Sequence, residues 1–187
     1  MGNTGVGGPA SWLPELYNKL LGTKFQVING YGSGTEVKLA MERGEVDGYC
    51  NPWAALISAT PELVRDHLIS IFVQAGVQKE KELPDVPLLS DFATNAEDKT
   101  TLDFISRSVS IGRAIGTTPG VPAARLAILR KAFDDTLADP DFLAEAAKEG
   151  ALIAPMDGTT LQQSIEEIVN TPQAIRDRVK AAMPEQL

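Results

Sequence analysis

Cysteine and histidine are almost absent from this chain of 187 residues, which contains one of each, Cys50 and His67. A single cysteine cannot form an internal disulfide and does not indicate a redox compartment. A single histidine excludes most zinc sites and most nucleophile–histidine pairs, because such sites combine several histidines, cysteines or acids. We therefore predict that the chain is not an enzyme and that it has no catalytic residues, no metal site and no cofactor.

Long apolar runs are also missing. No stretch approaches the ~20 apolar residues that a bilayer-spanning helix needs. The first residues, Met1 to Gly5, have neither a basic start nor an apolar centre, so no signal peptide is present. The protein is then either cytoplasmic or an exported protein whose signal has been removed.

Basic residues are outnumbered, because 17 Lys and Arg against 25 Asp and Glu give a net charge of −8. A negative surface repels phosphate backbones and anionic lipids, so neither nucleic acid nor a membrane surface is an expected partner. The net charge does not exclude a small anionic ligand, since such a ligand responds mainly to nearby backbone dipoles.

Helix-like and strand-like segments alternate along the first part of the chain. Residues 9–21 carry apolar side chains at helical spacing and stop at Gly22. Further helices are predicted at residues 36–43, after Thr60-Pro61 and at 95–108, and strands at 25–29, 46–50, 68–73 and 111–117. This order is typical of a parallel sheet covered by helices, so residues 1–115 are predicted to form a three-layer α/β lobe.

The sequence becomes mainly helical after the break at residues 119–122. A helix is predicted at 122–137, and Asp139-Pro140 and Thr171-Pro172 each place a capping oxygen before a proline at the first helical position. Residues 151–154 are the one candidate strand in this part. Short helices without a sheet of their own bury little apolar area, so we expect them to dock on a partner surface and the chain to be incomplete.

Two glycine-bearing loops, residues 3–8 and 30–35, each precede a predicted helix. Converging backbone N–H groups at a helix N-terminus suit a carboxylate or a phosphate. Ligands of open α/β sheets lie beyond the carboxyl ends of the strands, where these loops belong. Tight turns alone would also explain the glycines, and both interpretations stay open.

A dinucleotide site is not supported by these loops. Gly30 and Gly32 begin a G-x-G pattern, but Thr35 stands where the third glycine is needed. The remaining polar candidates lie in the segment 47–53, at the end of the strand predicted at 46–50 and the start of the next helix. Asp47 could orient a ligand amine or cap a loop, and Trp53 could wall a cleft or belong to the core.

Several segments resemble the receptor subunits of tripartite tricarboxylate transporters. They occur in the family's order across nearly the whole chain: Leu21–Phe25, Gly30-Tyr31 with Gly34, Ala40–Gly48, Leu83–Leu88, Pro119–Leu126 and Asp139–Leu143. The resemblance implies a type II periplasmic-binding-protein fold, in which two α/β lobes close on a carboxylate and backbone amides from both lobes hold it.

By this resemblance, residues 1–115 are lobe two and residues 116–187 are the mainly helical C-terminal part of lobe one. The rest of lobe one and the export signal are absent from the sequence. The implied protein is an extracytoplasmic, periplasmic receptor that delivers a small carboxylate to the membrane subunits of a transporter. It catalyses nothing.

The family's ligand-facing positions carry over to both loops and to the segment that follows. They are Thr4, Gly5 and Gly8 in the first loop, Tyr31, Ser33, Gly34 and Thr35 in the second, and Asp47 and Asn51. The second loop has Gly32-Ser33 where the family more often has proline or lysine, so the ligand that it selects is left open.

Two other hypotheses remain. The chain could be a small cytoplasmic α/β enzyme that binds a phosphorylated substrate at its glycine loops. It could also self-associate through uncovered apolar residues such as Leu126, Leu129 and Phe133.

Overall fold

The computed structural model describes residues 1–151 and 153–183 as a mixed α/β fold, mostly helical with one small parallel sheet. Its contacts divide the chain into two units. Unit 1 contains Met1–Pro52, Phe72–Val109 and the residues from Thr171 onward, and unit 2 contains Trp53–Ile71 and Ser110–Asn170. The predicted mixture of helix and parallel sheet is confirmed, whereas the type II binding-protein arrangement and the two lobes stay predictions.

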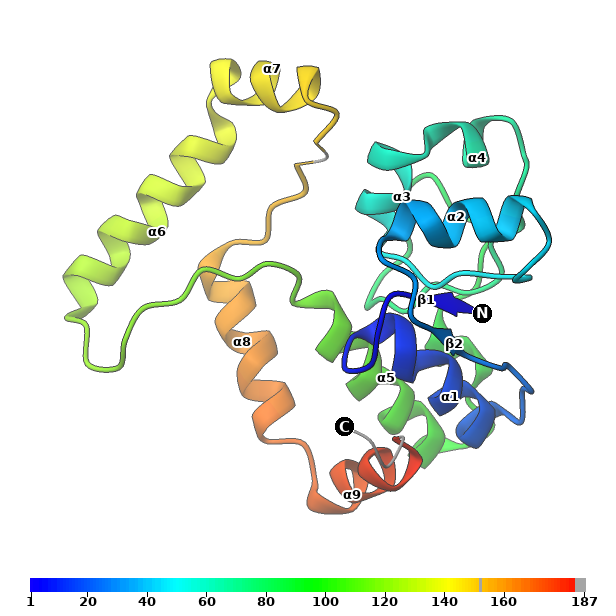
Figure 1. The fold of residues 1–187 in the computed structure, drawn as a ribbon. Coiled ribbons are helices and arrows are strands. Elements are labelled where there is room, and N and C mark those ends of the chain that lie inside the picture. The colour runs from blue at the N-terminus through cyan, green and yellow to red at the C-terminus, as the bar shows by residue number, and fades with distance from the viewer. Residues whose placement is uncertain (152, 184–187) are drawn as a thin grey trace. The chain divides into compact units, whose positions relative to one another are not determined.

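The sheet belongs to unit 1 and is built by a strand–helix–strand segment at the start of the chain (Figure 1). β1 (Gly2–Asn3) pairs in parallel with β2 (Ile28–Asn29), with Asn3 opposite Asn29. α1 (Pro9–Leu21) connects the two strands and covers the residues predicted for it. It begins with a proline, whose missing N–H costs nothing in the first turn, and ends at Gly22 with φ of 69°.

α2 (Gly34–Glu42) packs closely on β1, which is why position 2 is a glycine. A Cβ atom added to Gly2 would lie 2.7 Å from a methyl carbon of Val37. Gly2 also forms an isolated parallel bridge with Tyr49, and its N–H donates to the Gly48 carbonyl at 2.9 Å. Three separate segments therefore meet at β1.

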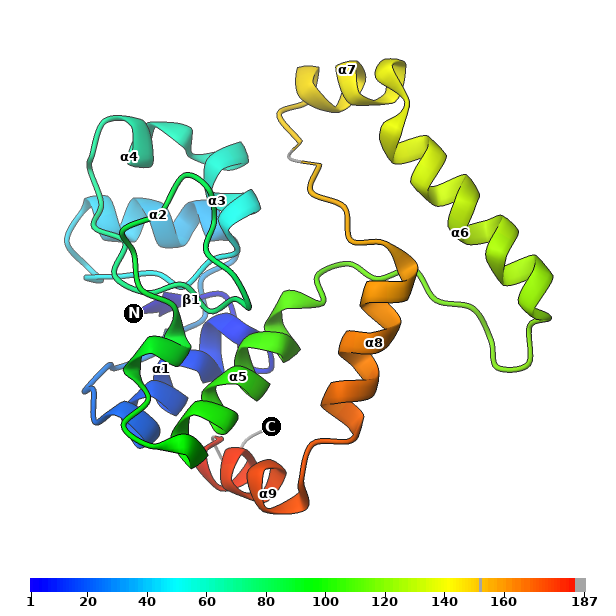
Figure 2. The ribbon, with the colours of Figure 1, turned by 180° about the vertical axis from the view of Figure 1, so that it is seen from behind.

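The apolar core of unit 1 joins helices that are far apart in the sequence. α5 (Ala96–Ser110) and α9 (Gln173–Ala182) lie beside α1, as Figure 2 shows from behind. The 3-10 helix η1 (Leu89–Phe92) joins the same core through Leu89. The most deeply buried apolar side chains of this core are Leu16, Leu89, Leu102 and Ile105, each at most 1% exposed. The spacing of apolar residues made α1 predictable. The start of α5 was predictable from Asn95, whose Oδ1 accepts a hydrogen bond from the Asp98 N–H at 2.8 Å.

Unit 2 consists of helices and irregular segments. α3 (Trp53–Ala59) contacts α4 (Pro61–Arg65), α6 (Ala123–Ala138) contacts α7 (Pro140–Lys148), and α8 (Gly158–Val169) follows. The last three of these helices lie wholly within the described residues, and none of them contains a buried residue. Ile128 and Leu129 of α6 are 68% and 51% exposed. The predicted helix at 122–137 is confirmed, but its apolar face is uncovered.

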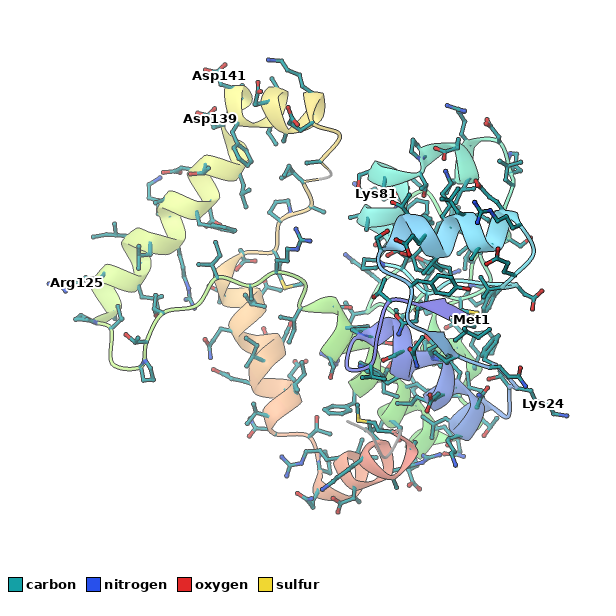
Figure 3. The ribbon with its side chains drawn as sticks, in the orientation of Figure 1. Met1, Lys24, Lys81, Arg125, Asp139 and Asp141 are labelled. Atoms are coloured by element: carbon teal, nitrogen blue, oxygen red, sulfur yellow. The ribbon has the colours of Figure 1, made fainter. Side chains whose placement is uncertain are left out.

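Asp139-Pro140 and Thr60-Pro61 look alike in sequence, but only Asp139 caps the helix that follows it. Asp139 accepts hydrogen bonds from the N–H groups of Asp141 and Phe142 at 2.9 and 3.0 Å, which starts α7 as predicted. Figure 3 shows Asp139 and Asp141 at the junction of α6 and α7, with Arg125 near the other end of α6. Thr60 does not cap α4, because its hydroxyl donates instead to the Leu56 carbonyl at 2.9 Å.

Most of the predicted strands are wrong. Residues 25–29 form a strand only at their last two positions, and 46–50 contribute only the single bridge at Tyr49. Residues 68–73 and 111–117 contain no strand, and neither do residues 151, 153 and 154; Leu152 lies outside the described residues. A strand is stable only beside a partner that satisfies its backbone, and none pairs with 68–73, where Leu68 and Phe72 are 64% and 53% exposed. The expected three-layer lobe is therefore reduced to a two-stranded sheet in the described chain.

Candidate functional site

The two glycine loops begin at neighbouring positions of the sheet. Asn3 and Asn29 are paired residues at the carboxyl ends of β1 and β2, and the Tyr31 N–H donates to the Asn3 carbonyl at 3.4 Å. The loops that follow carry all seven predicted ligand residues of this region, namely Thr4, Gly5, Gly8, Tyr31, Ser33, Gly34 and Thr35. Parallel pairing therefore places both loops at one edge of the sheet, although their contact with a ligand stays a prediction.

The first loop has backbone N–H groups that the protein itself does not use. Among the described residues, the N–H groups of Thr4 to Gly7 donate no backbone hydrogen bond. Gly8, the residue before α1, supplies no side-chain cap, and the first turn of α1 contains no acidic residue. These N–H groups and the positive end of the helix dipole are thus available to an anion.

The second loop already holds an anion of its own. The Glu36 carboxylate accepts a hydrogen bond from the Gly32 N–H at 2.8 Å, and the Ser33 hydroxyl accepts one from the Glu36 N–H at 3.3 Å. The Ser33-x-x-Glu36 spacing is a variant of the capping box, so this signal was present in the sequence. An external carboxylate at this loop would have to compete with Glu36.

Tyr49 contributes to the second loop and was missed by the sequence analysis. A Cβ added to Gly34 would lie 2.5 Å from the Tyr49 hydroxyl oxygen, so this hydroxyl lies against the first residue of α2. Burial raises the pKa of Tyr49, and the neighbouring Cys50 raises it further. The hydroxyl is therefore protonated at neutral pH and can donate a hydrogen bond.

The remaining predicted residues are less closely connected with the loops. Asp47 is exposed and Asn51 is half-buried, and no hydrogen bond or ion pair within the described chain joins either of them to the loops. Trp53 belongs to unit 2, where its indole N–H is buried without an acceptor among the described residues. Its proposed place in a cleft wall stays a prediction.

Reactive groups are few in the described chain. Burial raises the pKa of the Cys50 thiol to about 11, so the nucleophilic thiolate is scarce at neutral pH. His67 is exposed and has φ of 51°, directly after α4. The described residues contain no group of three histidine, cysteine or acidic side chains that could hold a metal ion. None of their helices is both long and apolar enough to cross a bilayer.

A hollow of about 190 Å³ lies in unit 1 near the end of α1. Its lining comes from α1, η1, α5, α9 and the connection between η1 and α5: Leu20, Leu21, Phe92, Thr94, Asp98, Thr101, Leu102 and Arg178. No predicted ligand residue lines it. The glycine loops, which combine unused N–H groups with a shared position at the sheet edge, form the better candidate site.

No model of a protein family matches the chain, and no curated protein has a significantly similar sequence.

Proposed function

We propose that this chain is the ligand-binding part of an extracytoplasmic receptor that captures a small carboxylate for a transporter of the tripartite tricarboxylate type. The observation that carries the proposal is the first loop, where N–H groups without a protein acceptor precede a helix at the carboxyl end of β1. The resemblance of the sequence to that receptor family supplies the type II fold, the periplasmic location and the membrane subunits as partners.

The exposed helices of unit 2 support the same proposal. α6, α7 and α8 bury no residue, and helices of this length gain most of their stability from packing an apolar face. In the proposed receptor, the rest of lobe one covers these faces and closes over the ligand together with lobe two. Ligand contacts made from both lobes then favour the closed state.

Thermal unfolding of a longer protein that contains both lobes tests this function. One class among di- and tricarboxylates, aromatic acids and acidic amino acids should raise its Tm, and the absence of any shift across the panel would count against a receptor. The chain of 187 residues alone should bind weakly or undetectably, because it presents one side of the site. Micromolar binding by calorimetry would contradict that expectation.

A phosphate-binding enzyme is the alternative that the same N–H groups allow. Stabilisation by phosphate or nucleotides, without stabilisation by carboxylates, would favour it. Self-association through the faces of α6 and α7 is a separate proposal, supported by Phe133 and Phe142, which are 39% and 38% exposed. A monomer in sizing chromatography would argue against it.

A further inference from the structure

One face of α6 is exposed from end to end and carries apolar side chains between two opposite charges. Ile128 and Leu129 are 68% and 51% exposed, and Ala132 is exposed beside them. The exposed Arg125 lies about one turn before this apolar group, and the exposed Asp135 about one turn after it. Spacings of three and four residues place side chains on the same face of a helix, so these five residues form one stripe, the α6 stripe.

The charges at the two ends of the α6 stripe oppose the dipole of the helix. A helix has a partial positive charge at its N-terminus and a partial negative charge at its C-terminus. Arg125 lies in the first turn of α6 and Asp135 in the last turn. The first turn contains no acidic residue and the last turn no basic residue to offset them. This charge order destabilises α6 by itself and suits a partner with the opposite order.

Arg125 forms no ion pair and no side-chain hydrogen bond within the described residues. Figure 3 shows it near the end of α6 opposite to Asp139. Asp135 pairs with Lys131 at 2.7 Å, but both side chains are exposed, and such a pair adds little stability. Arg125 and Asp135 lie about 15 Å apart along the helix axis, so they cannot pair within one helix. A contact between them requires two molecules.

The α6 stripe is complementary to itself when two copies run in opposite directions. A two-fold antiparallel crossing at residue 130 sets Arg125 of one copy level with Asp135 of the other, and Ile128 opposite the small Ala132. The two-fold axis repeats each of these contacts. A parallel pair would bring Arg125 beside Arg125. The charges therefore select a second copy of the chain in the antiparallel direction.

We infer that two copies of this chain associate through the α6 stripe, with their α6 helices antiparallel and Arg125 of each copy in contact with Asp135 of the other. The inference gives self-association a direction and a charged contact. It does not rest on carboxylate binding, so either proposal can fail without the other.

The test is sedimentation equilibrium of this chain over a range of concentrations, in the wild type and in three variants. The wild type should dimerise. In Arg125→Glu, an acidic side chain meets Asp135 of the second copy, so the Kd of the dimer should rise by about tenfold or more. Arg125→Glu combined with Asp135→Arg restores opposite charges across the pair and should recover most of the lost affinity.

The third variant, Lys99→Glu, is the matched control. Lys99 pairs with Asp103 in α5 of unit 1 at the same spacing as Lys131 and Asp135, and the substitution makes the same change of charge as Arg125→Glu. It should leave the Kd of the dimer unchanged. A general effect of net charge would weaken the dimer in both variants and would overturn the inference.

Unfolding of α6 is distinguished from loss of the contact by circular dichroism. The helix dipole favours an acidic residue in the first turn, so Arg125→Glu should keep its helix content while the dimer weakens. An unchanged Kd in Arg125→Glu, or a double variant as weak as the single one, would overturn the inference. A monomer at every concentration would also overturn it, and would leave the α6 stripe to a further segment of a longer chain.

Discussion

At the scale of single residues, the two glycine loops differ in what satisfies their backbone N–H groups. The N–H groups of the first loop can donate to solvent or to a ligand. In the second loop, the Gly32 N–H already donates to the Glu36 carboxylate. Glycine content alone therefore does not distinguish an anion site from a loop that already contains its own carboxylate. The distinction depends on a side chain four residues away, which the Ser33-x-x-Glu36 spacing encodes.

Replacing Glu36 by glutamine should make the second loop more receptive to anions. The variant removes a negative charge from the N-terminus of α2, so carboxylate affinity at this loop should rise while α2 loses about 0.3–1 kcal/mol of stability. Amide shifts of residues 30–35 during a carboxylate titration measure the affinity. Glu45→Gln is the control, because Glu45 lies outside α2 beside Arg43. Equal affinities in the two variants would show that Glu36 does not compete.

Gly34 and Tyr49 should be energetically coupled. A methyl group at position 34 would come too close to the Tyr49 hydroxyl, and Tyr49→Phe removes that oxygen. Gly34→Ala should therefore be more favourable in the Tyr49→Phe background than in the wild type, by about 0.5–3 kcal/mol. A double-mutant cycle by urea unfolding measures the coupling. If the effects of the two substitutions on the free energy of unfolding are additive, the Tyr49 hydroxyl does not lie against position 34.

At the scale of elements, the helices were largely predictable and the strands were not. α1, α5 and α6 follow local patterns of apolar spacing, capping residues, glycine stops and prolines, and each formed close to its predicted residues. A strand depends on a partner that the local sequence does not reveal. Residues 68–73 are as aliphatic as a central strand, yet no strand of the described chain pairs with them.

The packing of α9 on α1 could not be predicted from the sequence either, because it depends on contacts between residues that are far apart in the chain. α9 packs on α1, and Arg178 donates to Asp98 of α5 at 2.5 Å and to Thr101 at 3.2 Å. The pair Thr171-Pro172 predicted a helix with Pro172 at its first position, but α9 begins one residue later, at Gln173, with Pro172 as its N-cap. Its place in unit 1 could not be derived from that signal.

The Asp98–Arg178 link should make the stability of unit 1 depend on pH in the acid range. Hydrogen bonds from Thr94 and then from Arg178 lower the pKa of Asp98 below 3.8. The ionised Asp98 carboxylate therefore contributes fully to the stability of unit 1 above pH 3.8. This contribution is lost as the pH falls through the lower pKa of the folded state. Asp98→Asn should be less stable than the wild type at neutral pH, and the difference should shrink toward pH 2. Urea unfolding between neutral pH and pH 2 measures the difference in stability between the two proteins. A difference that does not change with pH would show that the Asp98–Arg178 link does not stabilise unit 1.

At the scale of the whole molecule, the sequence supported the general class of the fold and the placement of both glycine loops at strand ends. The mixture of helix and parallel sheet was predictable, and so was the placement of both loops at strand ends, since parallel strands bring their carboxyl ends together. The contacts that Asn3, Asn29 and Tyr49 make were not, because each depends on a partner brought close by folding. The uncovered faces of α6, α7 and α8 fit the expectation that these helices need a further surface.

The central claim is that the first glycine loop binds a carboxylate through its backbone N–H groups. The most direct test is a residue-by-residue map of backbone amide shifts in the longer protein that contains both lobes, at millimolar carboxylate, with chloride at equal ionic strength as the reference. We predict that the largest downfield shifts fall within residues 4–8, with smaller ones within 30–35. Shifts confined to other parts of the chain, or no shifts beyond those caused by chloride, would contradict the claim.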